Sequence, residues 1–88
     1  MKREWKGIWI PKEIWLNEKL TLQEKVFLVE IMSLDGDNGC FASNDYFAKF
    51  FNLSKTRVSL IIKSLLNKNC ITSHVSKEMG NRRIIHSL

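Results

Sequence analysis

The chain has 88 residues, of which 44% are hydrophobic and 26% charged, a composition that fits one small globular domain and excludes an intrinsically disordered chain. No apolar run approaches the roughly 20 residues of a membrane-spanning helix, and the charged, aromatic start MKREWKGIWIPKE lacks the apolar stretch of a signal peptide. We therefore expect a cytoplasmic protein with no membrane partner.

The net charge of +5 is unevenly distributed along the chain. Residues 1–45 carry six basic and eight acidic side chains, a net charge of −2. Residues 46–88 carry eight basic side chains and one acidic side chain, Glu78, a net charge of +7. A basic half on a small domain favours a polyanionic partner, most often nucleic acid. A solvated basic surface is the alternative interpretation of the charge alone.

An aromatic arm, residues 1–20, precedes the first long helix. The β-prone residues 7–10 come directly before Pro11, and proline disfavours helix in the residue before it. We expect an extended strand over residues 7–10 and a short helical turn over residues 12–15, which Pro11 can open.

The first long helix is predicted over residues 21–35. Thr21 and Glu24 form a capping box at its start, and the turn GDNG ends it. Its apolar residues do not form one stripe but lie nearly all round the helix, which is typical of a helix buried centrally or against a partner. The arm is the expected cover, through Trp5, Trp9 and Trp15. A homodimer through this helix and the aromatic arm is the alternative.

The remaining elements follow in a compact order. Residues 40–42 are expected to be extended, Ser43 caps a helix over residues 43–51, and Ser54 caps a helix over residues 54–68. Leu53, before the second cap, can pack on Val58 as a hydrophobic staple. Residues 70–88 then form a β-hairpin, with the β-prone runs 70–76 and 82–87 joined by the turn 77–81.

Two helices joined by a three-residue break are the plan of a helix-turn-helix. Ala48 is small where the two helices must approach closely, and Asn52 supplies a residue that tolerates the left-handed conformation of the turn. Val58 and Ile61 clamp the last helix onto the one before it. We predict a mainly α fold with a small β-hairpin: a single winged helix-turn-helix domain over residues 1–88, with a three-helix core, a wing and a short N-terminal strand.

The motifs "IPKEIW", "GCFASNDYFA" and "LSKTRVS" resemble the helix-turn-helix domains near the N-termini of phage and mobile-element proteins, replication initiators among them. The resemblance covers roughly residues 8–71. It implies a three-helix DNA-binding domain with a hairpin wing, acting in a replication initiator or transcriptional regulator near the nucleoid of a prokaryotic or phage-infected cell. The chain departs from the pattern at Lys68-Asn69-Cys70, where glycine usually ends the recognition helix; Asn69 can adopt the same conformation.

The helix over residues 54–68 has an apolar side and an opposite polar side that carries no acidic residue. In a helix-turn-helix the N-terminal part of this helix enters the major groove of double-stranded DNA. Arginine or lysine can donate to guanine O6 and N7, and hydroxyls can reach a base or a phosphate. Leu60, an apolar residue on the polar side, is expected to meet a thymine methyl or to be an ordinary exposed leucine. The predicted contact residues of the helix are Lys55, Thr56, Arg57, Ser59, Leu60 and Lys63.

The wing is predicted to supply the second contact with DNA, through Lys77, Asn81, Arg82 and Arg83. Adjacent strand residues point to opposite faces, so only one of the two arginines can face DNA. We favour Arg82, which is nearer the tip. For the same reason we expect one residue of the pair Ile84 and Ile85 to face the core.

Catalysis, cofactors and metal ions have little support in the sequence. The chain has no Gly-rich phosphate loop, no HExxH and no serine elbow, so we expect neither an enzyme nor a small-molecule substrate. Cys40, Cys70, His74 and His86 contain only one close pair of zinc ligands, where structural sites usually have two, so the cysteines are expected in the core. The alternative to DNA binding is a protein–protein adaptor with weak, non-specific DNA affinity.

Overall fold

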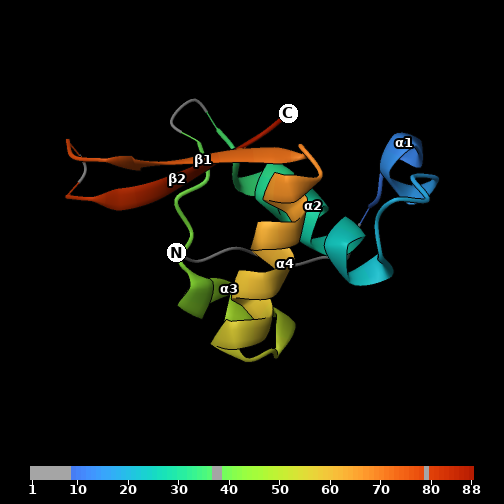
Figure 1. The fold of residues 1–88 in the computed structure, drawn as a ribbon, viewed down its shortest axis with the longest axis horizontal. Helices are drawn as coiled ribbons and strands as arrows, with labels where there is room; N and C mark the ends of the chain where they lie inside the picture. Colours follow the sequence, from blue (N-terminus) through green and yellow to red (C-terminus); the bar gives the residue numbers. More distant parts are fainter. Residues whose placement is uncertain (1–8, 37–38, 79) are drawn as a thin grey trace.

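The protein was analysed as a computed structural model that describes residues 9–36, 39–78 and 80–88. Four helices are followed by an antiparallel hairpin (Figure 1). The elements are α1 (Lys12–Trp15), α2 (Leu22–Leu34), α3 (Asn44–Phe51), α4 (Lys55–Asn67), β1 (Ile71–Ser76) and β2 (Arg82–Ser87). The mainly helical fold with a hairpin wing is as predicted, and in Figure 1 the hairpin extends beyond the helices on the side away from α1.

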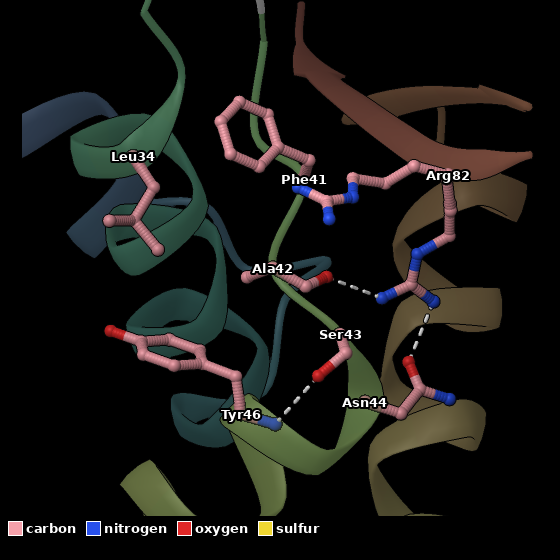
Figure 2. A pocket seen from close by; sticks show the side chains of 8 residues that line it. Leu34, Phe41, Ala42, Ser43, Asn44, Tyr46 and Arg82 are labelled. Atoms are coloured by element: carbon pink, nitrogen blue, oxygen red, sulfur yellow. Dashed lines mark hydrogen bonds between the residues drawn. The ribbon is translucent and has the colours of Figure 1, made fainter. Parts of the chain in front are cut away.

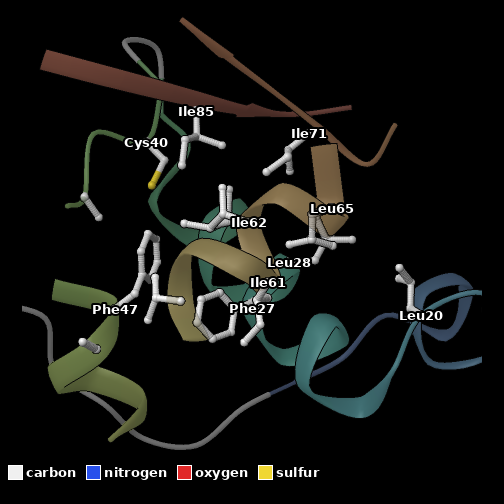
Figure 3. Close-up of a cluster of buried hydrophobic side chains, with 14 residues drawn as sticks. Leu20, Phe27, Leu28, Cys40, Phe47, Ile61, Ile62, Leu65, Ile71 and Ile85 are labelled. Atoms are coloured by element: carbon white, nitrogen blue, oxygen red, sulfur yellow. The ribbon is translucent and has the colours of Figure 1, made fainter. Parts of the chain in front are cut away.

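The core lies between α2, α3, α4 and the base of the hairpin. Phe27 of α2, Phe47 of α3 and Leu65 of α4 are fully buried in it, and Ile71 and Ile85 close it from the two strands (Figure 3). Hydrophobic burial contributes about 1.5–3 kcal/mol for each such side chain, so these contacts fix how α4 sits on its scaffold.

Each long helix begins at the cap that the sequence predicts. The Thr21 hydroxyl accepts a hydrogen bond from the Glu24 amide, and the Glu24 carboxylate accepts one from the Thr21 amide, which completes the capping box. Ser43 accepts from the Tyr46 amide at the start of α3. Ser54 accepts from the Arg57 amide at the start of α4, so the N-terminus of α4 is already ordered by the chain's own side chain.

Two asparagines end helices in the left-handed conformation, as predicted. Asn52, which follows α3, has φ 56° and ψ 52°, and Asn69, which follows α4, has φ 59°. The chain therefore turns from α3 into α4 within the residues 52–54, and Ala48 is buried between them. This short turn sets the angle between the two helices.

We expect Asn52→Ala to lower the free energy of unfolding by about 1 kcal/mol, because a β-carbon is strained at positive φ and asparagine's side chain tolerates it best. Asn52→Gly should be nearly neutral. Urea unfolding measures both, with Asn67→Ala as the matched control, since alanine is favourable in an exposed helical position such as that of Asn67. Equal stabilities for the alanine and glycine variants would contradict the prediction.

The hairpin has the register Ile71↔Ser87 to Ser76↔Arg82, and Cys40 adds a single antiparallel bridge to Ile85 on the other side of β2. The extended segment predicted around Cys40 is thus confirmed. As predicted, one residue of the pair Ile84 and Ile85 faces the core. Ile85 joins the core, whereas Ile84 is covered from the outer face by the turn at Gly39, where it leaves no room for a side chain.

The N-terminal arm differs from the prediction. Trp9 and Ile10 form no strand, and the rest of the predicted strand lies outside the described residues. The tryptophans that the structure describes do not cover α2, because Trp9 is 80% exposed and Trp15 is 52% exposed. The Trp15 ring instead lies 4.9 Å from Lys25 Nζ. The cover on that side is provided by Leu20, which is buried, and Ile14, which packs against the core; Trp5 lies outside the described residues.

Candidate nucleic-acid interface

Helix α4 presents a polar surface opposite its buried side. Val58, Ile61, Ile62 and Leu65 are buried, as predicted. No acidic residue is present in α4. The side chains that the structure leaves exposed on this helix include all six predicted contact residues: Lys55, Thr56, Arg57, Ser59, Leu60 and Lys63.

The side of α4 nearest α2 is fastened by one buried carboxylate. Glu24 is only 4% exposed, and it accepts hydrogen bonds from the Lys68 ammonium at 2.7 Å and from the Ser64 hydroxyl. Burial alone raises the pKa of Glu24, but the bonds from Lys68, Ser64 and the Thr21 amide outweigh it and lower that pKa to about 2. The capping residue of α2 is therefore also the anchor of α4.

Arg57 is also held on the side of α4 that is nearest α2. Its Nε and Nη2 both donate to Gln23 Oε1, at 3.0 and 2.8 Å, although both side chains are near the surface. Arg57 precedes Ser64 by seven residues, or two helical turns, so the two residues face the same side of the helix. Gln23 precedes Glu24, and the ordered first turn of α2 brings both toward α4.

Leu60 lies at the rim of a hollow of about 210 Å³ between α2 and α4, lined by Thr21, Glu24, Arg57, Leu60, Ile61, Ser64 and Lys68. Its side chain is 54% exposed. Leu60 is thus outside the core, as the helical register requires. The carboxylate of Glu24, although it belongs to the same hollow, is buried and paired with Lys68, so the surface around Leu60 stays free of an unpaired acid.

Lys55 lies at the start of α4 beside the first turn of α3. Its ammonium is 3.7 Å from Asp45, which also pairs with Lys49 at 3.1 Å. All three side chains are largely exposed, so these pairs contribute little to stability and can exchange for a phosphate partner. Thr56, Ser59 and Lys63 make no hydrogen bond or ion pair through their side chains within the described part of the chain.

The two arginines at the start of β2 pair with Ser76 and Val75 of β1, and their side chains have different surroundings. Arg83 Nη1 donates to Asn44 Oδ1 at 2.6 Å, and Arg83 Nη2 donates to the Ala42 carbonyl at 2.9 Å. Figure 2 labels the two acceptor residues, Asn44 and Ala42, and marks both bonds as dashed lines. Burial lowers the pKa of Arg83. Its guanidinium therefore ties the wing to the start of α3.

Arg82 stays exposed, with its guanidinium carbon 5.5 Å from the centre of the Phe41 ring. Both arginines line an open pocket of about 740 Å³ beside the start of α3. Lys77 and Asn81, in the turn between the strands, are also exposed. Three of the four predicted wing residues thus reach solvent, and Arg83 is the one that the structure uses as an anchor.

The comparison with protein families agrees with this geometry. Residues 18–69, more than half of the chain, match the model of a family described as a helix-turn-helix domain. The chain belongs to the helix-turn-helix family. The matched range begins before α2 and ends after α4, so it holds the three helices described above. Neither the search of curated proteins nor the search of solved structures returned a significant match.

Membership of the helix-turn-helix family supports DNA as the partner of this domain. In helix-turn-helix domains the second helix of the motif is the one that enters the major groove, and α4 occupies that position in the motif of this chain. None of the helices among the described residues is long and apolar enough to span a membrane.

The sequence did not reveal that Gln23 and Glu24 contact α4 or that Asn44 contacts the wing. Each bonds a residue at least 34 positions away, so no local spacing signals the contact. Of these residues only Glu24 had a signal in the sequence. The capping box placed its carboxylate at the start of a helix but did not reveal its partners on α4.

The residues considered as zinc ligands do not come together as one group within the described residues. Cys40 is fully buried, and Cys70 is partly buried against the core. His74 and His86 stack with ring centres 5.6 Å apart, and His86 Nδ1 is 3.4 Å from Asp35 Oδ1. No group of three or more metal-ligating side chains occurs within residues 9–36, 39–78 and 80–88.

Proposed function

We propose that this helix-turn-helix domain binds double-stranded DNA in a sequence-specific manner, with α4 in the major groove and the wing on the backbone. The observation that carries the proposal is the surface of α4, where Thr56, Ser59 and Lys63 are exposed with no acidic neighbour on the helix. Such side chains can reach base edges and phosphates. The core fixes this helix rigidly, which suits readout at the precision of hydrogen bonds.

In this arrangement Arg82 is the wing residue that contacts phosphate, together with Lys77 and Asn81 at the tip. Arg83 supports them by holding the wing against α3 through Asn44. No catalytic step is part of the proposal. The resemblance of the sequence to phage and mobile-element proteins favours a replication initiator or a transcriptional regulator as the setting of the domain.

Salt dependence tests the backbone contact. A preferred duplex is first selected from random sequences, and its affinity is then measured by fluorescence titration at several salt concentrations. We expect the logarithm of the affinity to fall with the logarithm of salt, and Arg82→Ala to lower that slope by about one unit, because one phosphate contact is lost. Lys12→Ala, on the exposed α1, is the control with an unchanged slope. Affinity that ignores salt would overturn the proposed function.

Leu60→Ala should weaken binding to the preferred duplex by roughly three- to tenfold, through loss of an apolar contact with a thymine methyl. The free energy of unfolding should change little, since Leu60 is already half exposed. Replacing the contacted thymine by uracil removes only the methyl group. The wild-type protein should bind the uracil duplex more weakly than the thymine duplex, by a similar factor. The Leu60→Ala variant should bind both duplexes with equal affinity. A large loss of stability would instead assign Leu60 to packing.

A second candidate function is that of an adaptor that binds another protein or a second copy. The observation that favours it is the exposed apolar surface at α1 and the start of α2, made by Trp15, Leu16 and Leu22. Sedimentation velocity distinguishes the two functions. A strict monomer that binds one duplex tightly supports DNA binding alone, whereas concentration-dependent association that Leu22→Ser abolishes supports the adaptor. A dimer that also binds DNA specifically would combine both functions.

A further inference from the structure

The contact between Gln23 and Arg57 joins an exposed arginine of the proposed reading helix to a different helix. An exposed arginine ordinarily samples many rotamers, and ordering it costs up to about 2 kcal/mol. Here two of its five N–H donors, one on Nε and one on Nη2, are already bonded to Gln23 Oε1. The side chain is therefore pre-ordered before any ligand arrives.

Because Gln23 bonds one edge of the Arg57 guanidinium, only the N–H donors on the rest of the group remain for a ligand. The bonds to Nε and Nη2 occupy one side of the planar fork. The guanidinium keeps three free N–H donors, two on Nη1 and one on Nη2. One on each nitrogen points outward in parallel, which gives the pair of donors that a bidentate contact needs. Guanine presents O6 and N7 as the matching pair of acceptors in the major groove.

Gln23 is itself fixed by the same turn that anchors α4. The neighbouring Glu24 accepts hydrogen bonds from the Thr21 amide, from Ser64 and from Lys68, and these bonds tie the first turn of α2 to α4. They support the position of Gln23 beside Arg57. Within the described residues its side-chain NH₂ group has no hydrogen-bond partner, so the carbonyl end can be used for Arg57 without competition.

We propose that Gln23 is a positioning residue for sequence readout: it holds Arg57 by the Nε–Nη2 side so that the Nη1–Nη2 end is presented to a guanine. The proposal rests on the proposed function, since it concerns which base the same surface recognises. Gln23 acts through Arg57 and not by contact with the DNA.

The test compares four variants, Gln23→Ala, Arg57→Ala, the two changes combined and Gln23→Glu, on the selected duplex and on an unrelated duplex of equal length. Gln23→Ala should reduce the preference for the selected duplex by about three- to tenfold, less than Arg57→Ala, and leave affinity for the unrelated duplex and the salt slope unchanged. In the Arg57→Ala background, Gln23→Ala should have no further effect, because the residue acts only through Arg57. Gln23→Glu keeps the acceptor for Arg57 and adds a negative charge. It should therefore lower the affinity for both duplexes by the same factor and preserve the preference for the selected duplex.

A measurement on the free protein checks the geometry independently of DNA. The Arg57 Nε–H resonance in a nitrogen–proton NMR spectrum should exchange slowly with water in the wild type and quickly in Gln23→Ala. Thermal unfolding should differ little between them, since alanine suits an exposed helical position. Loss of preference that persists in the Arg57→Ala background would show that Gln23 contacts DNA itself and overturn the proposal. An unchanged preference in Gln23→Ala would also overturn the proposal for Gln23. In that case a loss of preference in Arg57→Ala would still support the proposed DNA-binding function.

Discussion

Arg57→Ala combined with Lys63→Ala should lower affinity for the preferred duplex by at least about a hundredfold, which is the largest functional effect we expect from the surface of α4. A good base contact contributes about 1–3 kcal/mol of discrimination, and both side chains are exposed on the polar side of the helix. The double variant should unfold at nearly the same urea concentration as the wild type, because neither side chain is part of the core.

The matched control for that variant is Lys12→Ala combined with Lys19→Ala. It removes the same net charge from exposed positions outside α4. If the loss is purely a matter of net charge, both double variants weaken binding equally, and the preference for the selected duplex stays the same. Binding that survives the change on α4 would show that this helix does not read the DNA.

Glu24→Gln should lower the free energy of unfolding at pH 7 by about 3 kcal/mol, the largest effect on stability that we expect from a polar side chain. Its pKa is about 2 in the folded protein against an ordinary value of 4.5, and each unit corresponds to about 1.4 kcal/mol. Because the folded-state pKa is lowered, this stabilisation is fully present above about pH 4.5. It is lost as the pH falls from there toward 2.

Urea unfolding of the wild type and of Glu24→Gln between pH 7 and pH 2.5 measures the effect. The difference between the two proteins should be constant above pH 5 and should shrink below it, because the Glu24 carboxylate of the unfolded chain then takes up a proton while that of the folded protein stays ionised. Glu13→Gln, on the exposed surface of α1, should show almost no difference at any pH. A difference between wild type and Glu24→Gln that does not change with pH would mean that packing, and not the charge, is responsible.

The two predictions concern one connected structure. Glu24 fixes the start of α2 against Ser64 and Lys68 near the end of α4, and Gln23 lies beside it against Arg57 near the beginning of α4. The helix that is proposed to enter the major groove is therefore held along its length by the first turn of α2. Removing the Glu24 carboxylate, as in Glu24→Gln, should loosen the support of Arg57 as well.

The local features of this fold could be predicted from the sequence because they depend on residues close together in the chain. The capping box at Thr21, the serine caps, the left-handed Asn52 and the hairpin after α4 were all confirmed. Helical and strand periods also placed the buried residues Val58 and Ile61 correctly. Each of these features is set by backbone geometry within a few residues, so no tertiary contact was needed to recognise it.

The tertiary structure alone decided which partners these elements meet. Trp9 and Ile10 form no strand, and the predicted cover of α2 by Trp9 and Trp15 was wrong, because aromatic content does not tell on which side of the fold an arm lies. Ile84 is buried because the distant turn at Gly39 covers the outer face of β2.

The same division applies to the proposed site. The sequence by itself determined the residue types on α4 and in the wing: a basic surface without acids, presented by a capped helix. The structure decided that Arg83 anchors the wing to Asn44 and that Arg57 is held by Gln23. The physical reason is distance along the chain: a hydrogen bond between side chains 34 or 39 residues apart exists only after the core has brought their helices and strands together.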